Sequence, residues 1–487
     1  MAKDLVHNVV AKGILSVFNA LLPLVITPYV YHLLGPEGMG NIEYATVLFG
    51  YFSMLGMLGI YNYGLREIST NRNDASKRNY IFKNLFAIGV LSNILFLGIY
   101  ILFIHFFLKT PELKMISYIL CGNLVSQIFY IEWLNEALEE FKFITVKTVI
   151  IRSLSLIFIF LFVRSASDAM IYVWITVGVQ LVNYLVSFFY GINNIKFRIR
   201  DFFCDLNVKP FLVPLLMILV LNNTGILYTI ADRTILGHFT NLENVAYFSI
   251  GQRIVEMIKT LLLSIVFATL PRFALYLNED KAKYQEGILK VMRLLLFIII
   301  PAGVGLFLLA DSIIWIFGGE QYMAGLSAMR VFSLRIILLG VDAILYNQII
   351  FLHGKELILV KYNLICGAIN LVLNFIFIPI LSPFISILCT LVSEIVFEIL
   401  CITYIRRHLH IKMGIFTWTT YRYLLISLLF VPIVYGIGLL DAERLLKVVL
   451  SVTTCVVVYA TTLHLLHDDA YEQIRGYFMK LFNRRPA

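Results

Sequence analysis

Charged residues stand near the middle of an apolar stretch, residues 247–273, that is long enough to span a bilayer. Arg253, Glu256 and Lys259 share an arc of roughly 140° on a helix with neighbouring Ser, Gln and Thr residues. A charge at the centre of a spanning helix costs about 2.5–3.5 kcal/mol, so we expect this face to meet water. Two cations against one anion favour an anionic ligand. The alternative is that the three charges neutralise one another at i,i+3 spacing.

The stretch 324–350 repeats this pattern with Arg330, Arg335 and Asp342. Arg335 and Asp342 are seven residues apart, so they lie about 20° apart on a helix. We expect both side chains to point into one cavity. Snorkelling toward the outer surface is the alternative explanation for Arg330, which lies nearer the outer end.

Carboxylates at depth suggest ion coupling. Glu394 lies mid-way along 383–405, with Glu398 one turn further on, and a buried carboxylate near other charges can bind and release H+ or Na+. The alternative is that Glu394 is the counter-ion of a cation on a neighbouring helix. Asp232 and Arg233, near the outer end of 211–237, follow an "NNTG" sequence that favours a loosened helix and a gating role.

The N-terminal half holds fewer deep charges. Pro23 and Pro28 predict a bent first helix. Lys147 and Arg152 lie just inside 144–164 and are placed to meet a phosphate from the cytoplasmic side. Anchoring at the inner surface is the simpler explanation for Lys147.

Composition places the chain among membrane proteins. Of its 487 residues, 60% are hydrophobic and 14% charged, and the mean hydropathy is +0.86. Soluble domains are about one quarter charged. Fourteen spanning helices are predicted, near 10–33, 41–64, 84–108, 114–137, 144–164, 169–190, 211–237, 244–270, 288–310, 324–350, 357–381, 383–405, 418–440 and 445–466.

Basic residues orient these helices. With both termini cytoplasmic, 29 of the 39 Lys and Arg residues fall in inner segments and 5 in outer ones. This asymmetry follows the positive-inside rule. The same dispersal argues against nucleic-acid binding, which needs a basic stripe.

The sequence lacks the features that several other classes of function require. The outer loops are expected to be short, about eight residues at most, leaving no room for the extracytoplasmic domain of a membrane glycosyltransferase. No P-loop, dinucleotide-binding motif or HExxH occurs, so no cofactor or metal is indicated. His408 and His410 stand beside Arg406 and Arg407, which favours a basic membrane anchor over a metal site. The protein is not expected to be an enzyme.

A weak internal repeat suggests two lobes. At an offset of 202 residues Thr27 aligns with Thr229, Leu34 with Leu236 and Gly35 with Gly237. The offset equals six helices, which predicts two six-helix lobes related by a pseudo-twofold axis, a geometry suited to alternating access. We assign 1–200 to the N-terminal lobe, 201–410 to the C-terminal lobe, and 411–487 to two extra helices and a tail. The tail is expected to be an amphipathic interfacial helix or a solvated segment.

Four segments then resemble a known family: "LLGPEGMGNIEYA" (33–45), "GLREIST" (64–70), "EWLNEALEEFKFITVKTVIIR" (132–152) and "ADRTILG…VAYFSIGQRI" ending in "LPRF" (270–273). In order and spacing they are similar to polysaccharide flippases of the Wzx type, within the multidrug/oligosaccharidyl-lipid/polysaccharide exporter superfamily. The first helix lacks the basic cluster of the lipid II flippase branch, which favours the polysaccharide branch.

This resemblance implies transport of an undecaprenyl-pyrophosphate-linked oligosaccharide from the inner to the outer leaflet of a bacterial plasma membrane. It implies a cationic cavity, ion-driven alternating access, and a glycan polymerase and a chain-length regulator as candidate partners besides the lipid bilayer. The candidate substrate-binding residues are Arg152, Arg233, Arg253, Lys259, Arg330 and Arg335. The candidate ion-coupling residues are Asp232, Glu256, Asp342 and Glu394, with H+ or Na+ as the ion.

Two alternatives remain. A cation-coupled exporter of small molecules would have twelve helices and an acidic cavity. A non-transporting scaffold of a glycan-assembly complex would not need Arg253, Lys259 and Arg335 at depth.

Overall fold

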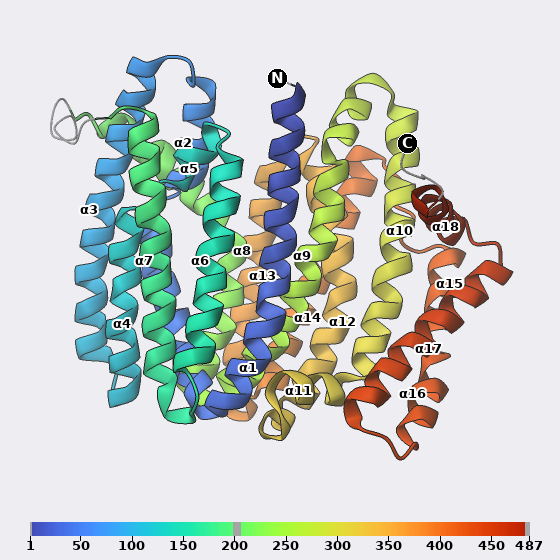
Figure 1. Ribbon diagram of the computed structural model, residues 1–487. Helices are drawn as coiled ribbons and strands as arrows, with labels where there is room; N and C mark the ends of the chain where they lie inside the picture. Colours follow the sequence, from blue (N-terminus) through green and yellow to red (C-terminus); the bar gives the residue numbers. More distant parts are fainter. Residues whose placement is uncertain (1, 198–205, 483–487) are drawn as a thin grey trace. The chain divides into compact units, whose positions relative to one another are not determined.

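The protein is a bundle of long apolar helices. The computed structural model describes residues 2–197 and 206–482, except the side chains of 2–12, 14, 16, 17, 20, 221–229, 265 and 477–482. Within these residues every regular element is a helix (Figure 1). Eleven of the helices are long and apolar enough to cross a membrane. The all-helical membrane fold is therefore confirmed, whereas the count of fourteen spans stays a prediction.

The helices form two compact units, residues 1–246 and 247–487. The predicted lobe boundary at 200/201 lies outside the described residues. The helices that begin in the first unit are α1 (Ala2–Met57), α2 (Ile60–Thr70), α3 (Ala75–Phe107), α4 (Pro111–Ile128), α5 (Glu132–Ala137), α6 (Phe141–Phe162), α7 (Ala169–Asn194), α8 (Lys209–Phe239) and α9 (Leu242–Glu279). The second unit takes most of α9, followed by α10 (Lys281–Leu308), α11 (Ala310–Gly318), α12 (Leu326–Ile344), α13 (Glu356–Ile376), α14 (Pro383–Tyr404), α15 (Trp418–Ser427), α16 (Phe430–Gly438), α17 (Arg444–Leu465) and α18 (Asp469–Phe482).

Each unit has its own packing order. In the first, α3, α4, α7 and α6 stand side by side, and α1 packs against α3, α4 and α6 (Figure 1). In the second, α10 packs on α12, α12 on α14, and α14 on α13, and α15 packs on α10. The side chains that face outward are apolar: on α3, Leu91, Leu95, Leu102 and Phe106 are all exposed at helical spacing. Such a face suits hydrocarbon, because backbone polar groups of a helix are satisfied internally.

The first helix is bent sharply at Gly35. Its φ of 67° and ψ of 177° interrupt α1, so that one long element contains two predicted spans. Pro36 follows directly, and a proline disfavours the α conformation of the residue before it. The aligned Gly237 has a different role, since a Cβ there would lie 2.4 Å from the Tyr44 ring. The repeat therefore places glycine at both positions for different local reasons.

Several predicted spans are interrupted. The predicted helix 114–137 is two helices, α4 and α5, and the predicted helix 418–440 is α15 and α16. The predicted helix 324–350 is α12 followed by the π-helix η4 (Leu345–Phe351). The Gln348 side chain in η4 donates to the Val266 carbonyl and to Thr269 Oγ1, which fixes this wide turn against α9. By contrast, the "NNTG" backbone at 222–225 lies inside continuous α8, so the loosening expected there is wrong, and its side chains lie outside the described residues.

One of the predicted outer connections is longer than expected. The expectation of outer loops of about eight residues is wrong between α10 and α12, where α11 and the 3-10 turn η3 (Glu320–Gly325) intervene. Gly319 joins them with a φ of 79°, a backbone conformation that favours glycine. This connection still contains only two short helices.

Aspartate side chains accept backbone hydrogen bonds just before two of the helices. Asp280 precedes α10 and accepts from the amides of Lys283 and Ala282. Hydrogen bonds from the Lys283 amide and ammonium hold the pKa of the Asp280 carboxyl below its usual value. Asp168, before α7, accepts at Oδ2 from the amides of Arg164 and Ser165, which closes the turn that leads into this helix.

At the tail, a helix is present as α18, but Phe478 and Leu481, half of its predicted apolar face, lie outside the residues whose side chains are described. Its interfacial position stays a prediction.

Replacing Gly35 with alanine should destabilise the fold, because Gly35 has a φ/ψ pair that only glycine adopts readily. We expect a loss of about 1–3 kcal/mol. Thermal unfolding of the purified protein in detergent measures this as a lower Tm. Gly38→Ala is the matched control, since its Cβ would make ordinary contacts with Leu34 Cβ at 3.4 Å and Ala169 Cβ at 4.0 Å. Equal Tm values for the two variants would contradict the strained-kink interpretation.

Candidate functional site

A buried ion pair occupies the second unit between α12 and α14. The Arg335 guanidinium donates from Nε to both Glu394 carboxylate oxygens, at 3.0 and 2.8 Å, and from Nη2 to Oε1 at 2.6 Å. Arg335 is 7% exposed and Glu394 is 8% exposed. Bidentate, charge-assisted hydrogen bonds of this kind are strong and fix the geometry of both side chains. Glu394 thus contacts a cation on a neighbouring helix, which is the alternative explanation given for this residue above.

Asp342 and Lys259 extend this pair into a cluster. Asp342 interacts electrostatically with Lys259 on α9, Glu394 and Arg335. Its Oδ1 atom is buried and has no hydrogen-bond partner among the described residues. The structure thus brings together four of the predicted site residues from three helices.

Glu398 joins the same cluster. It lies one turn after Glu394 on α14, is 6% exposed, and has Asp342 and Glu394 as electrostatic neighbours. Neither of its carboxylate oxygens has a hydrogen-bond partner among the described residues. A buried carboxyl group without hydrogen-bond partners is costly, because nothing in the protein replaces the water that it has lost. Glu398 is not among the candidate ion-coupling residues, although its i+4 spacing from Glu394 is a sequence signal for this position.

The cluster has more acids than bases. Lys259 and Arg335 are its cations, and Asp342, Glu394 and Glu398 are its carboxyl groups. With every group ionised, the formal charge would be one negative. Among the described residues no group of three or more His, Cys, Asp or Glu side chains is arranged to hold a metal ion.

Close helix contact places Lys259 beside α12. A Cβ on Gly251 would lie 2.5 Å from the Phe332 ring, so only glycine lets α9 approach α12 this closely. On the polar face of α9, Gln252 Nε2 donates to Glu256 Oε1 at 2.7 Å. Arg253 and Lys259 are half-buried, and Glu256 is exposed. Ile250, Ile254 and Val255 are buried on the other side.

Arg330 lies apart from this cluster. Its guanidinium is 5.9 Å from the centre of the Phe307 ring, and its side chain lines a separate cavity with residues of α16 and α17. The structure therefore does not bring Arg330 together with Arg335 and Asp342.

In the first unit, Arg233 is paired. Its Nη1 atom is 3.3 Å from Glu43 Oε2, and Tyr31 donates to Glu43 Oε1 at 2.9 Å. Glu43 is 2% exposed, and the neighbouring Asp232 is 1% exposed. The pair joins α8 to the second half of α1, where Tyr51 and Thr234 are also hydrogen-bonded at 3.1 Å.

Arg152 and Lys147 have different surroundings. Arg152 Nη1 donates to Asn19 Oδ1 at 2.6 Å, linking α6 to α1. Lys147 is buried and forms an ion pair with Glu132 at 3.0 Å, while Ser187 donates to the same carboxylate. The expectation that Lys147 is a surface anchor is therefore wrong. A buried cation needs a partner, and Glu132 at the start of α5 supplies it.

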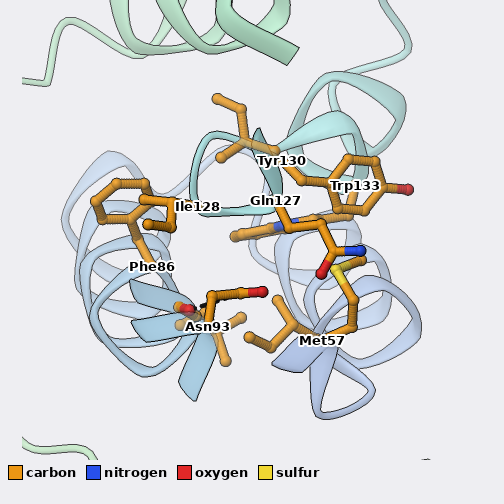
Figure 2. Close-up of a pocket in the computed structure, with 11 residues that line it drawn as sticks. Met57, Phe86, Asn93, Gln127, Ile128, Tyr130 and Trp133 are labelled. Carbon is orange, nitrogen blue, oxygen red and sulfur yellow. Dashed lines mark hydrogen bonds between the residues drawn. The ribbon is translucent and has the colours of Figure 1, made fainter. Parts of the chain in front are cut away.

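A small cavity lies at the break between α4 and α5. Its volume is about 20 Å³, and Met57, Phe86, Asn93, Gln127 and Trp133 are among the residues that line it. Figure 2 shows Asn93 and Gln127 extending into the space between the helices. This volume suits about one water molecule, so it is not a site for a sugar.

Comparisons with known proteins agree with this architecture. The family model described as "Polysaccharide biosynthesis protein" matches residues 5–277, more than half of the chain. The "Putative O-antigen transporter" of Escherichia coli (strain K12) is 23% identical over 380 residues, covering 76% of this chain and 89% of that protein.

Solved transporters share the fold. The lipid II flippase MurJ, in an inward closed conformation, is similar with a TM-score of 0.72 and 13% identity, covering 95% of this chain and 99% of that one. An inward-facing multidrug resistance MATE family transporter of the MOP superfamily is similar with a TM-score of 0.59 and 13% identity, covering 83% and 94%. These relatives are transporters and flippases, and the protein is a multi-span membrane protein of the same fold. The chain belongs to the polysaccharide biosynthesis protein family.

Proposed function

We propose that this protein is a flippase for lipid-linked oligosaccharides. It moves undecaprenyl-pyrophosphate-bound glycan repeat units from the inner to the outer leaflet of the bacterial plasma membrane by alternating access, with both termini cytoplasmic. The observation that carries this proposal is the buried charge cluster of α9, α12 and α14 in a chain of this family and fold. A glycan polymerase and a chain-length regulator are the proposed partners.

The cargo explains why cations lie at depth. A pyrophosphate cannot cross hydrocarbon alone, and the sugars attached to it need a hydrated path. Arg253 and Lys259, on the polar face of α9, are the proposed contacts to the pyrophosphate, because a half-buried cation attracts an anion more strongly than one in bulk water. Arg335 acts through Glu394 by holding the cluster in place.

The acid-rich cluster is proposed to couple transport to protons. Binding of the anionic head group beside Lys259 would draw this cation away from Asp342. Loss of a cationic neighbour favours the protonated form of a carboxyl group. Proton uptake by Asp342 and Glu398 thereby compensates for the interaction that Lys259 transfers to the cargo.

The Glu43–Arg233 pair is proposed as a gate on the outer side, between the part of α1 that follows the Gly35 bend and the outer end of α8. It lies beside the Tyr51–Thr234 hydrogen bond and the close contact of Tyr44 with Gly237. These contacts must separate before cargo can leave on the outer side. A buried ion pair holds such a contact closed, since separating two buried charges is costly.

Arg253→Ala should reduce glycan export at least about tenfold, because it removes a charge-assisted contact worth about 1.5–3 kcal/mol. The assay is transfer of a short-chain polyprenyl-pyrophosphate oligosaccharide across proteoliposomes, with the inserted protein quantified. The matched control is Arg272→Ala on the same helix, an exposed residue whose Nε donates to the Tyr276 hydroxyl. Full transport by Arg253→Ala would refute the substrate assignment.

Glu398→Gln should make transport independent of a pH gradient. Glutamine keeps the shape of a protonated glutamate but cannot release a proton. Wild-type proteoliposomes with an imposed pH difference should transport faster than those without one, whereas the variant should show one rate in both. Glu356→Gln, at an exposed position, is the control. A pH response in Glu398→Gln equal to that of the wild type would rule out this carboxyl group as the coupling site.

Glu43→Gln should open the outer side. Without its partner, Arg233 no longer holds α8 to α1, so Thr234→Cys in the same chain should react faster with a membrane-impermeant maleimide added outside. We expect about a tenfold increase, equivalent to about 1.4 kcal/mol. The control is Glu37→Gln, an exposed carboxylate before the same helical segment. Unchanged labelling in Glu43→Gln, relative to Thr234→Cys alone, would contradict the gate.

A further inference from the structure

A second charged cavity lies in the second unit, away from the cluster described above. Its volume is about 630 Å³, and it is bounded by the end of α10, by α11 and α12 on one side and by α16 and α17 on the other. Arg330, Arg444 and Lys447 contribute three cations to its lining, and Asp311 contributes one carboxylate. Leu308, Leu309, Val434 and Leu439 supply an apolar wall.

Arg444 is held by neighbouring acids. Its Nη1 atom is 2.8 Å from Glu320 Oε1, and its Nη2 atom is 3.5 Å from Asp311 Oδ2. The guanidinium also lies 5.3 Å from the centre of the Trp315 ring. The longer α10–α12 connection, which contains α11 and η3, thus serves to fix this arginine at the cavity wall.

The other two cations have neutral partners. Lys447 Nζ donates to the Gly438 carbonyl at 3.0 Å. Arg330 lies over the Phe307 ring. Among the described residues, neither is within ion-pair distance of a carboxylate. Among the lining residues three cations face one carboxylate, Asp311, and Glu320 pairs with Arg444. Asp441 and Glu443 flank the lining residue Ala442 in the sequence, so what marks the site is Lys447 and Arg330, the two cations that pair with no carboxylate among the described residues.

The predicted topology places this cavity at the outer surface, where cations are scarce. Only five Lys and Arg residues fall in predicted outer segments, and Arg444 and Lys447 are two of them. Positive charge on the outer side runs against the usual distribution in membrane proteins. A ligand that binds these cations is anionic. A ligand that also covers the apolar wall carries a hydrocarbon portion.

We propose that this cavity binds the phosphodiester head group of an anionic phospholipid from the outer leaflet, with Lys447 and Arg330 contacting the phosphate and the acyl chains lying along α10 and α16. A phosphate group suits Lys447 and Arg330, whose partners among the described residues are a carbonyl group and an aromatic ring, and acyl chains suit the apolar wall beside them. This gives the two helices beyond the predicted twelve a role in lipid binding. The proposal does not depend on the transported cargo.

Lipid binding can be measured on the full-length protein in nanodiscs. We compare the Tm of the protein in nanodiscs of phosphatidylcholine alone and in nanodiscs with about one third phosphatidylglycerol. Native mass spectrometry counts the phosphatidylglycerol molecules that the protein retains. The wild type should gain several degrees and retain phosphatidylglycerol. The double variant Arg330→Gln/Lys447→Gln should lose this gain and bind the lipid at least about a hundredfold more weakly, at least about tenfold for each lost charge-assisted hydrogen bond.

Two controls make the result decisive. Lys109→Gln/Arg164→Gln removes two other predicted outer cations, both exposed, and should behave as the wild type. The Tm of each variant in phosphatidylcholine alone separates loss of folding from loss of lipid binding. Equal gains in the wild type and in Arg330→Gln/Lys447→Gln would overturn the proposal.

The source of the phosphate is tested in separate arms. Glycerol phosphate in solution should give no stabilisation, and the same gain from this soluble anion would overturn a lipid site. A polyprenyl pyrophosphate should not displace phosphatidylglycerol at equal concentration. Preferential displacement would assign the cavity to the cargo and overturn the phospholipid assignment.

Discussion

The cost of an ionised side chain in hydrocarbon governs how this protein is built. Arg335 and Glu394 are almost fully buried, and each is tolerated because the other supplies bidentate hydrogen bonds across α12 and α14. Lys147 and Glu132, with Ser187, solve the same problem in the first unit. Such pairs are weak contributors to net stability, because desolvation offsets much of the attraction, but removing one partner is severely destabilising. The charges are therefore more easily explained by what they do than by what they stabilise.

Interruptions of the helices accompany these charges. α1 is bent at Gly35 and ends at Met57, α4 ends before Glu132, and the π-helix η4 follows Asp342 within one turn. Each interruption frees backbone polar groups, which in a membrane must find partners inside the protein. Ser92 and Asn93 donate to the Gly56 carbonyl, and Tyr284 donates to the Gln348 carbonyl. The broken helices are thus places where polar side chains are needed, which is typical of helices that line a transport path.

Much of the fold was predictable because the bilayer imposes a simple pattern. Apolar runs of about 20 residues separated by basic loops indicate spanning helices without any knowledge of their packing. The polar face of α9 was predictable in the same way, since Arg253, Glu256 and Lys259 recur at helical spacing. The interruptions at 58–59 and 129–131 were not predicted, because the hydropathy pattern continues through them. The predicted spans 288–310 and 324–350 leave residues 311–323 as a loop, and the short helix α11 and turn η3 in this connection were not predicted because they are too short to show as a span.

Helical periodicity and hydropathy are local properties, so the amino-acid sequence alone shows which residues are charged at depth, on which helices they lie and toward which end. Which of these charges meet depends on how the helices pack. Arg335 pairs with Glu394, which is 59 residues away in the sequence, and Arg233 pairs with Glu43, which is 190 residues away. Glu398 belongs to the cluster of α9, α12 and α14, whereas Arg330 lines a separate cavity. The physical reason is that an ion pair depends on the distance between two side chains, and that distance is set by how whole helices pack. Close contacts between helices, such as that of Gly251 with Phe332, fix these distances, and no local sequence pattern predicts such contacts.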